Sequence, residues 1–122
     1  MSLVSVLRPF LALDGLVAIV VFSHDGLLVE ALGPGVIEAE QAAAELASVA
    51  GAARHAFMAL GMGEPVQQVV TLAKHEAMLF RYAEYALALI FQPHGNRALV
   101  HQILDAVGPQ IQRLLGGRYA AR

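Results

Sequence analysis

The chain has 122 residues, no cysteine, a hydrophobic share of 57% and a formal net charge of −2. Its length suits one domain, residues 1–122, and the apolar excess predicts that part of the surface is an interface. The missing cysteines exclude disulfides, thiolate metal sites and cysteine nucleophiles, and the absence of a Lys/Arg cluster argues against a nucleic-acid partner. Apolar runs are short and no cationic leader is recognisable, so we expect no membrane insertion and a cytoplasmic location.

The first quarter of the chain predicts a short helix followed by a hairpin. Apolar residues recur at helical spacing over residues 3–10 behind a possible cap at Ser2, and Pro9 should kink or shorten that helix. Residues 16–23 are β-branched and apolar on both faces, which is typical of a central strand. Residues 27–32 return as its antiparallel partner.

Two Asp-Gly pairs bracket the first predicted strand, and they could be either chemistry or turns. Asp14-Gly15 precedes the strand and Asp25-Gly26 follows it. Asp and Gly tolerate left-handed backbone angles, and turn residues at opposite ends of one strand point apart. We therefore interpret both pairs as turns and not as paired catalytic carboxylates.

A long helix is predicted over residues 38–60, and it has two unusual faces. Its predicted core stripe has steps of three and four and consists of Ala42, Leu46, Val49, Ala53, Phe57 and Leu60. The opposite face carries small residues where charged ones are usual, namely Ala44, Ser48, Gly51 and His55. Simple Ala-rich composition is one explanation, but a glycine costs roughly 1 kcal/mol inside an exposed helix. The small face is therefore a candidate for close approach by another backbone.

The loop after this helix, Gly61–Pro65, resembles part of a glycine-rich phosphate-binding signature. It follows a helix instead of preceding one, so it presents no helix N-terminus to a phosphate. A connection to a strand is the better interpretation. Three strands, 66–73, 77–82 and 86–91, should then precede a last helix that begins near Asn96, kinks at Gly108-Pro109 and stops at Gly116-Gly117.

Candidate catalytic side chains are few. The five histidines fall in turns or singly on helices, and no two have the HxxxH spacing of a metal site. Ser23 and Ser48 lack a nucleophile elbow. We therefore expect no catalytic, metal or cofactor-binding residues, and no enzymatic activity of the chain's own.

The predicted order is α-β-β-α-β-β-β-α, which gives an α+β fold. It implies a five-stranded antiparallel meander with one long helix on one face and two helices on the other, and its first and last strands lie centrally because both are apolar on both sides. The chain resembles the Roadblock / dynein light chain family, of profilin/longin-like architecture. The resemblance rests on "LDGLVAIVVFSHDGLLVEAL", on "AAAELASVAGAARHAFMALG", and on "YALALIF" followed by a helix.

The resemblance implies a homodimer in which the long helices pack together and the third strands pair into one sheet. Relatives of the bacterial gliding-motility type bind a Ras-like small GTPase and control its nucleotide cycle, in processes such as cell polarity. One Lys against seven Arg fits a GC-rich bacterial genome. The dimer or partner interface is expected to include Ala44, Ala47, Ser48, Gly51, Arg54, His55, Gln67, Val69 and Thr71.

Two function classes follow. The favoured one is a homodimeric, non-enzymatic regulator or scaffold that docks a Ras-like small GTPase and changes its nucleotide cycle, for instance as a GTPase-activating partner. The alternatives are a sensor with a small-ligand pocket between the sheet and the last helix, and a light-chain-type adaptor that does not regulate a GTPase.

Overall fold

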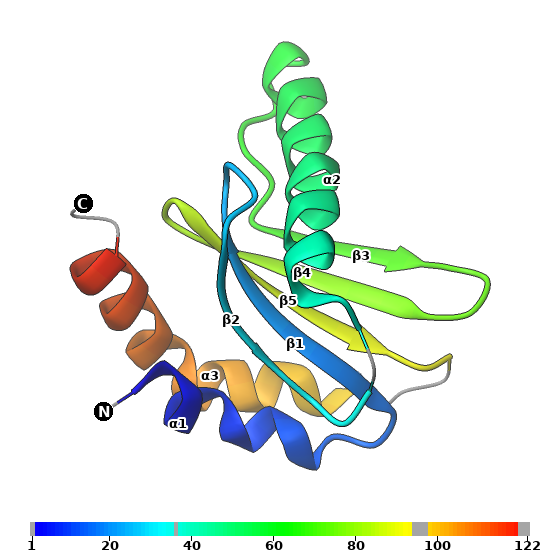
Figure 1. The fold of residues 1–122 in the computed structure, drawn as a ribbon. Coiled ribbons are helices and arrows are strands. Elements are labelled where there is room, and N and C mark those ends of the chain that lie inside the picture. The colour runs from blue at the N-terminus through cyan, green and yellow to red at the C-terminus, as the bar shows by residue number, and fades with distance from the viewer. Residues whose placement is uncertain (1, 36, 94–97, 120–122) are drawn as a thin grey trace.

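The computed structural model describes residues 2–35, 37–93 and 98–119. Their order confirms the predicted α-β-β-α-β-β-β-α arrangement (Figure 1). Short 3-10 and π-helical segments, η1 and η2, extend the first and last helices. The elements are α1 (Leu3–Leu7), η1 (Arg8–Ala12), β1 (Leu16–Ser23), β2 (Leu28–Leu32), α2 (Ala39–Ala59), β3 (Gln67–Thr71), β4 (Glu76–Tyr82), β5 (Tyr85–Phe91), α3 (Ala98–Arg113) and η2 (Leu114–Tyr119).

The five strands form one antiparallel sheet in the order β2-β1-β5-β4-β3. β1 and β5 are central, as their apolar sequences predict, and Val20 pairs with Ala88 across them. The expected single meander is wrong in detail, because a β1–β2 hairpin lies beside a separate β3–β4–β5 meander. Joining them through β1 and β5 buries the two most apolar strands on both faces and leaves β2 and β3 as edges.

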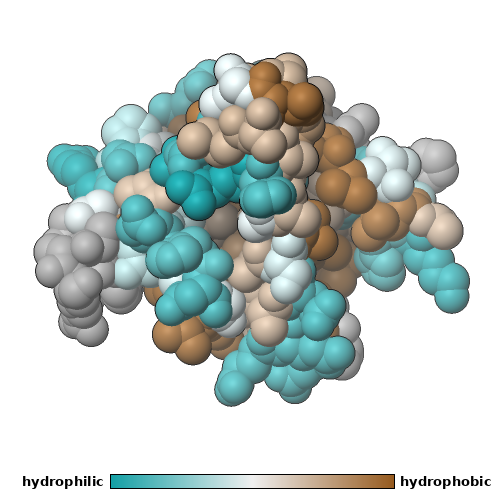
Figure 2. All heavy atoms as spheres, turned by 90° about the horizontal axis from the view of Figure 1, so that it is seen from above, coloured by the Kyte–Doolittle hydropathy of each residue, from teal (hydrophilic) through white to brown (hydrophobic). Residues whose placement is uncertain are grey.

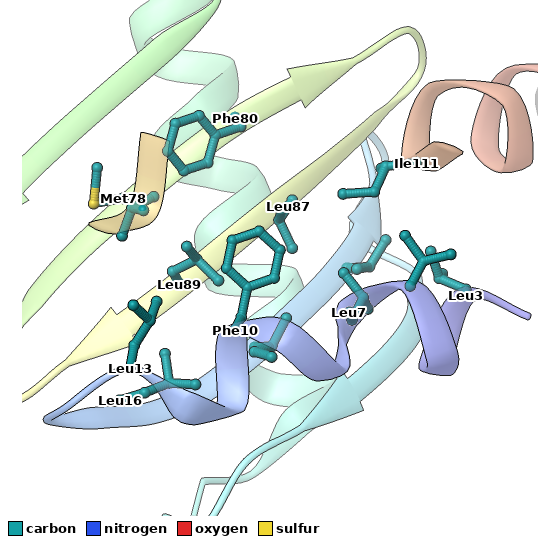
Figure 3. Close-up of a cluster of buried hydrophobic side chains, with 14 of the residues drawn as sticks. Leu3, Leu7, Phe10, Leu13, Leu16, Met78, Phe80, Leu87, Leu89 and Ile111 are labelled. Atoms are coloured by element: carbon teal, nitrogen blue, oxygen red, sulfur yellow. The ribbon is translucent and has the colours of Figure 1, made fainter. Parts of the chain in front are cut away.

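Helices cover both faces of the sheet, as predicted (Figure 1). The face covered by α1, η1 and α3 holds a core of large side chains, in which Leu7 and Phe10 pack toward Leu87 and Leu89 of β5 (Figure 3). The face covered by α2 has a smaller core of alanines with a few larger strand residues, among them Phe22. The helix α2 therefore lies close to the sheet.

The N-terminal turns form as their sequence predicts. The Ser2 hydroxyl accepts from the Ser5 N–H at 3.1 Å in a capping box, and Pro9 lies in the 3-10 segment that ends α1. Both Asp-Gly pairs lie in turns, and Gly26 has a φ of +91°. The Asp25 carboxylate accepts a hydrogen bond from the Ser23 hydroxyl, which holds the pKa of Asp25 below its usual value. Asp25 is therefore part of the turn, as expected.

The last helix differs from its prediction at its C-terminal end. The proposed cap, Asn96, lies outside the described residues. Pro109 lies inside α3, which runs past it to Arg113. The predicted stop at Gly116-Gly117 is wrong, since π-helical backbone continues to Tyr119. Buried contacts of Ile111 and Leu115 hold this end of the chain on the sheet and outweigh the local preference of two glycines.

The two edges of the sheet are unlike each other. At the β2 edge, Glu30 Oε1 accepts from the backbone N–H of Ala31 at 3.1 Å, and the β1–β2 register shifts between Val21 and Phe22. At the β3 edge the register with β4 runs without a shift, from Gln67 opposite Phe80 to Thr71 opposite Glu76. Only the β3 edge therefore presents a regular strand to a partner.

Within the described ranges, no helix has both the length and the apolar character that crossing a bilayer requires.

Candidate interaction surface

The side of α2 that faces the sheet is lined by alanines. Ala43 and Ala47 are buried, at 0% and 8% exposure, against the strand residues Ala18, Val20 and Phe22. The predicted core stripe is therefore correct near the start of the helix, where Ala42 and Leu46 pack partly buried against this core, and wrong toward its end. Short side chains at this contact let the helix backbone lie close to the sheet, which larger residues would prevent.

The bulky residues of the predicted core stripe lie on a flank of α2 and reach the surface. Val49 is 46% exposed, Phe57 40% and Leu60 68%, whereas Leu46 is half-buried nearer the start of the helix. The reason is the placement of α2, which packs mainly on β1 and β2 while its C-terminal half projects beyond the sheet (Figure 1). The projecting half has apolar side chains with nothing of its own subunit to cover them.

Exposed apolar residues continue from α2 through the following loop into β3. Figure 2 looks down on the free end of α2, where brown and tan residues gather around that end and along one side. We call this set the apolar stripe, and it comprises Val49, Phe57, Met58, Leu60, Met62, Val66, Val69 and Leu72. Large exposed apolar side chains that gather on α2 and in the loop after it are typical of an interaction site.

The β3 edge borders this stripe. Gln67, Val69 and Thr71 are exposed and share the face that carries α1 and α3, while Gln68 and Val70 are half-buried on the α2 face. The alternation and the regular register leave one row of backbone groups of β3 directed away from β4. The edge residues predicted from the sequence are thus all accessible.

The small-residue face of α2 lies on the other flank. Ala44, Ser48, Gly51 and His55 are exposed, and the Ser48 hydroxyl donates back to the Ala44 carbonyl at 3.3 Å. Part of this flank accommodates the chain's own hairpin, because a Cβ at Gly26 would lie 3.4 Å from the Ala44 Cα.

Ala47 was expected among the interface residues, and the structure places it elsewhere. Its side chain is packed against the sheet with 8% exposure, so it offers little surface to a partner subunit. Ala47 is three residues from Ala44 and four from Gly51, which puts it beside the small-residue face in a helix. Its own side chain points from the edge of that face toward the sheet.

Three charged residues connect the projecting half of α2 to the sheet. Glu64, in the loop after α2, lies 2.6 Å from Arg54 Nε of α2 and 2.6 Å from Arg81 Nη2 of β4. The hydrogen bond from Arg54, assisted by the charge of Arg81, holds the pKa of the Glu64 carboxyl below its ordinary value of 4.5. Arg54 was expected at the interface, but no spacing in the sequence marks Glu64 or Arg81 as its partners.

Among the described residues, no three His, Cys, Asp or Glu side chains group as metal ligands. His24 Nδ1 lies 3.3 Å from Glu84 Oε2, where the β1–β2 and β4–β5 turns meet, and both side chains are largely exposed. This pair joins two turns at the same end of the sheet.

The family model for the Roadblock/LC7 domain matches residues 4–92, which is most of the chain. The chain belongs to the Roadblock/LC7 family. This membership confirms the resemblance found in the sequence. The arrangement of one long helix on one face of the sheet and two helices on the other is that of the Roadblock/LC7 fold. No match was found among curated proteins.

Solved structures share this Roadblock/LC7 fold at low sequence identity. A Roadblock/LC7 domain from Streptomyces avermitilis is 19% identical, with a TM-score of 0.75 over 91% of this chain and 98% of that one. The gliding protein MglB from Thermus thermophilus is 17% identical, with a TM-score of 0.78 over 90% and 85%. A structure titled MglB with tetrameric arrangement is 19% identical, with a TM-score of 0.77 over 90% and 85%.

Proposed function

We propose that this protein is a cytoplasmic, non-enzymatic homodimer that binds a Ras-like small GTPase and modulates its nucleotide cycle. Family membership supports the class, because gliding-motility regulators are among the relatives that the sequence resembles. The tetrameric arrangement of one MglB supports self-association as a property that this fold allows.

The observation that carries the proposal is the apolar stripe beside the open β3 edge. A second copy would pair its β3 with this β3 and lay its own α2 against the projecting half, so that the stripe residues on α2 and in the loop after it become buried in both copies, while Val69 lies at the paired strand edge on the opposite face. Burial of apolar area contributes about 25 cal/mol per Å², and a two-fold arrangement buries the same patch on both subunits. The edge residues Gln67, Val69 and Thr71 belong to this interface.

In this proposal, the dimer regulates the GTPase by binding its GTP and GDP states with unequal affinity. A partner shifts a GTPase between its GTP and GDP states only if it binds the two states with different affinity. The dimer has no catalytic group to donate in this proposal, so it acts by positioning the GTPase's own catalytic residues. A dimer that bound both states equally would be an adaptor.

The dimer surface is tested with two substitutions that are two residues apart on α2. Phe57 and His55 are both exposed and point to nearly opposite flanks of the helix. Phe57→Arg should convert the dimer to monomer in sedimentation velocity, because two cations would enter an apolar contact. His55→Arg, on the small-residue flank that the sequence predicted as the interface, should leave the dimer intact, because this proposal places the contact on the flank of exposed bulky residues. Dissociation by His55→Arg alone would move the interface to that flank and contradict the proposal.

The GTPase is sought by capture from a native lysate and then studied purified. With the captured GTPase loaded with GDP or with a non-hydrolysable GTP analogue, the two dissociation constants should differ by at least about tenfold, which is roughly 1.4 kcal/mol of selectivity. Phe57→Arg should weaken the tighter complex if the GTPase contacts both subunits. Equal affinities would leave the adaptor as the function.

A further inference from the structure

A cleft of about 130 Å³ lies between α2 and the sheet. Its floor is formed by strand residues on the α2 face, including Phe22, Leu79 and Ala86, and one wall is the α2 surface of Ala47, Ala50 and Gly51. Pro65 and Val66 form the other wall, and the β4–β5 turn closes one end. The cleft therefore lies on the α2 face of the sheet. The pocket of the predicted sensor was expected on the opposite face, between the sheet and α3.

The cleft exists because its helix wall has almost no side chains. A Cβ added at Gly51 would meet no atom within 4 Å, so the space beside this residue is open. Glycine weakens an exposed helix by roughly 1 kcal/mol relative to alanine, and no close contact at this position explains it. An apolar cavity of about 150 Å³ in another protein holds one benzene molecule. The cleft therefore has room for a single aromatic ring.

Arginine side chains stand among these apolar walls. Arg54 and Arg81 both line the cleft, and the Glu64 carboxylate fixes both guanidinium groups, each through one contact of 2.6 Å. A guanidinium has five N–H donors, so each arginine keeps donors for another acceptor.

The acidic groups that line the cleft are already engaged. Glu64 is shared by two cations, and Glu84 pairs with His24 at 3.3 Å. An incoming carboxylate therefore meets two positioned arginines that share one carboxylate, so the cluster of Arg54, Glu64 and Arg81 keeps one uncompensated positive charge and unused N–H donors.

We infer that this cleft is a binding site for a small aromatic carboxylate, with the ring between Gly51 and the sheet and the carboxylate on Arg54 and Arg81. The site goes beyond the proposed GTPase function and does not depend on it. Its position under the projecting half of α2 would place a ligand between this helix and the sheet.

Benzoate and its neutral isostere benzamide are the probes, and the full chain labelled with ¹⁵N is titrated by NMR. We expect saturable benzoate shifts at Gly51 and Ala83, with a dissociation constant of about 1 mM or below, and benzamide binding at least tenfold weaker. Equal binding of both probes would contradict the assigned ligand class, and no saturation by benzoate up to about 10 mM would contradict the site itself.

Gly51→Leu should fill the cleft and abolish benzoate shifts at Ala83. Ala52→Leu adds the same side chain one position along, where helical spacing directs it away from the sheet, and should leave benzoate affinity unchanged. Both variants should stay folded, since Gly51 has open space and Ala52 is exposed.

Arg54→Gln tests whether the charge of the cleft, and not only its shape, contributes to benzoate affinity. It should lower benzoate affinity toward that of benzamide, with Arg81 still in place, while benzamide affinity stays constant. Retained benzoate binding in Gly51→Leu, or an unchanged preference for benzoate in Arg54→Gln, would overturn the assignment. Sedimentation of each variant shows whether self-association has changed, which keeps this result separate from the test of the dimer.

Discussion

Glu64 joins three parts of the molecule through a single carboxylate. It lies in the loop that returns from α2 to β3, and it contacts one arginine on α2 and one on β4. Its side chain is 23% exposed, less than that of Arg54 or Arg81. One acidic residue thus fixes the angle between the projecting half of α2 and the sheet.

The pH dependence of this contact has a definite sign. The folded pKa of Glu64 is lowered, so the carboxylate stabilises the fold fully above about pH 4.5, and this contribution is lost as the pH falls through the folded pKa. NMR titration of the Glu64 carboxyl carbon should give a midpoint below 4.5. Glu64→Gln should be less stable than wild type near pH 7, and the difference should shrink in acid. A midpoint above 4.5 would show that the arginines do not hold the charge.

Among the elements, α3 tolerates an unusual pair in its interior. Gly108 precedes Pro109 inside the helix, and a Cβ at Gly108 would lie 3.6 Å from the Tyr82 hydroxyl, an ordinary contact distance. Tyr82 lies half-buried there, and burial raises the pKa of its phenol. The space under α3 is therefore filled by Tyr82 and not by a residue of the helix.

Gly108→Ala should leave the free energy of unfolding within about 0.5 kcal/mol of the wild type, because the better helix propensity of alanine is offset by the contact of its Cβ with Pro109, which disfavours helical backbone at the residue before a proline. Gly26→Ala is the contrasting variant. Its φ of +91° and the 3.4 Å approach to the Ala44 Cα should make it destabilising by at least about 1 kcal/mol. Urea unfolding of both variants tests these expectations, and a loss of stability of more than about 1 kcal/mol in Gly108→Ala would mean that the helix needs glycine before Pro109.

Sequence periodicity predicted every strand and helix to within a few residues, because central strands and capped helices leave clear patterns. It failed on which side of α2 is the core. Both Val49 and Ala47 lie on apolar rows of helical spacing, and periodicity alone assigns the bulkier row to the core. The structure keeps only the start of the bulky row, at Leu46, packed against the core and leaves the rest of that row exposed, because short alanines let the helix lie close to the sheet. The Glu64 contacts join three separate elements, so no local pattern could predict them.

At the scale of the whole molecule, the stripe on α2 and β3 predicts that stability depends on protein concentration. Folding and self-association are linked, so dilution lowers the apparent melting temperature of a dimer but not of a monomer. Calorimetry over a hundredfold range of concentration should show this shift for wild type and His55→Arg, and not for Phe57→Arg. A melting temperature of the wild type that stays constant over this range of protein concentration would argue against the dimer.

The unlike edges of the sheet also set how far assembly can proceed. The carboxylate of Glu30 occupies the N–H of Ala31, and the shifted register disrupts the β1–β2 ladder, so the β2 edge is a poor template for another strand. A sheet that can be extended only at β3 is closed once two copies have paired there. Strand addition then has no free end on which to continue. The chain can thus display an open, regular strand to its own kind without becoming the first unit of a fibre.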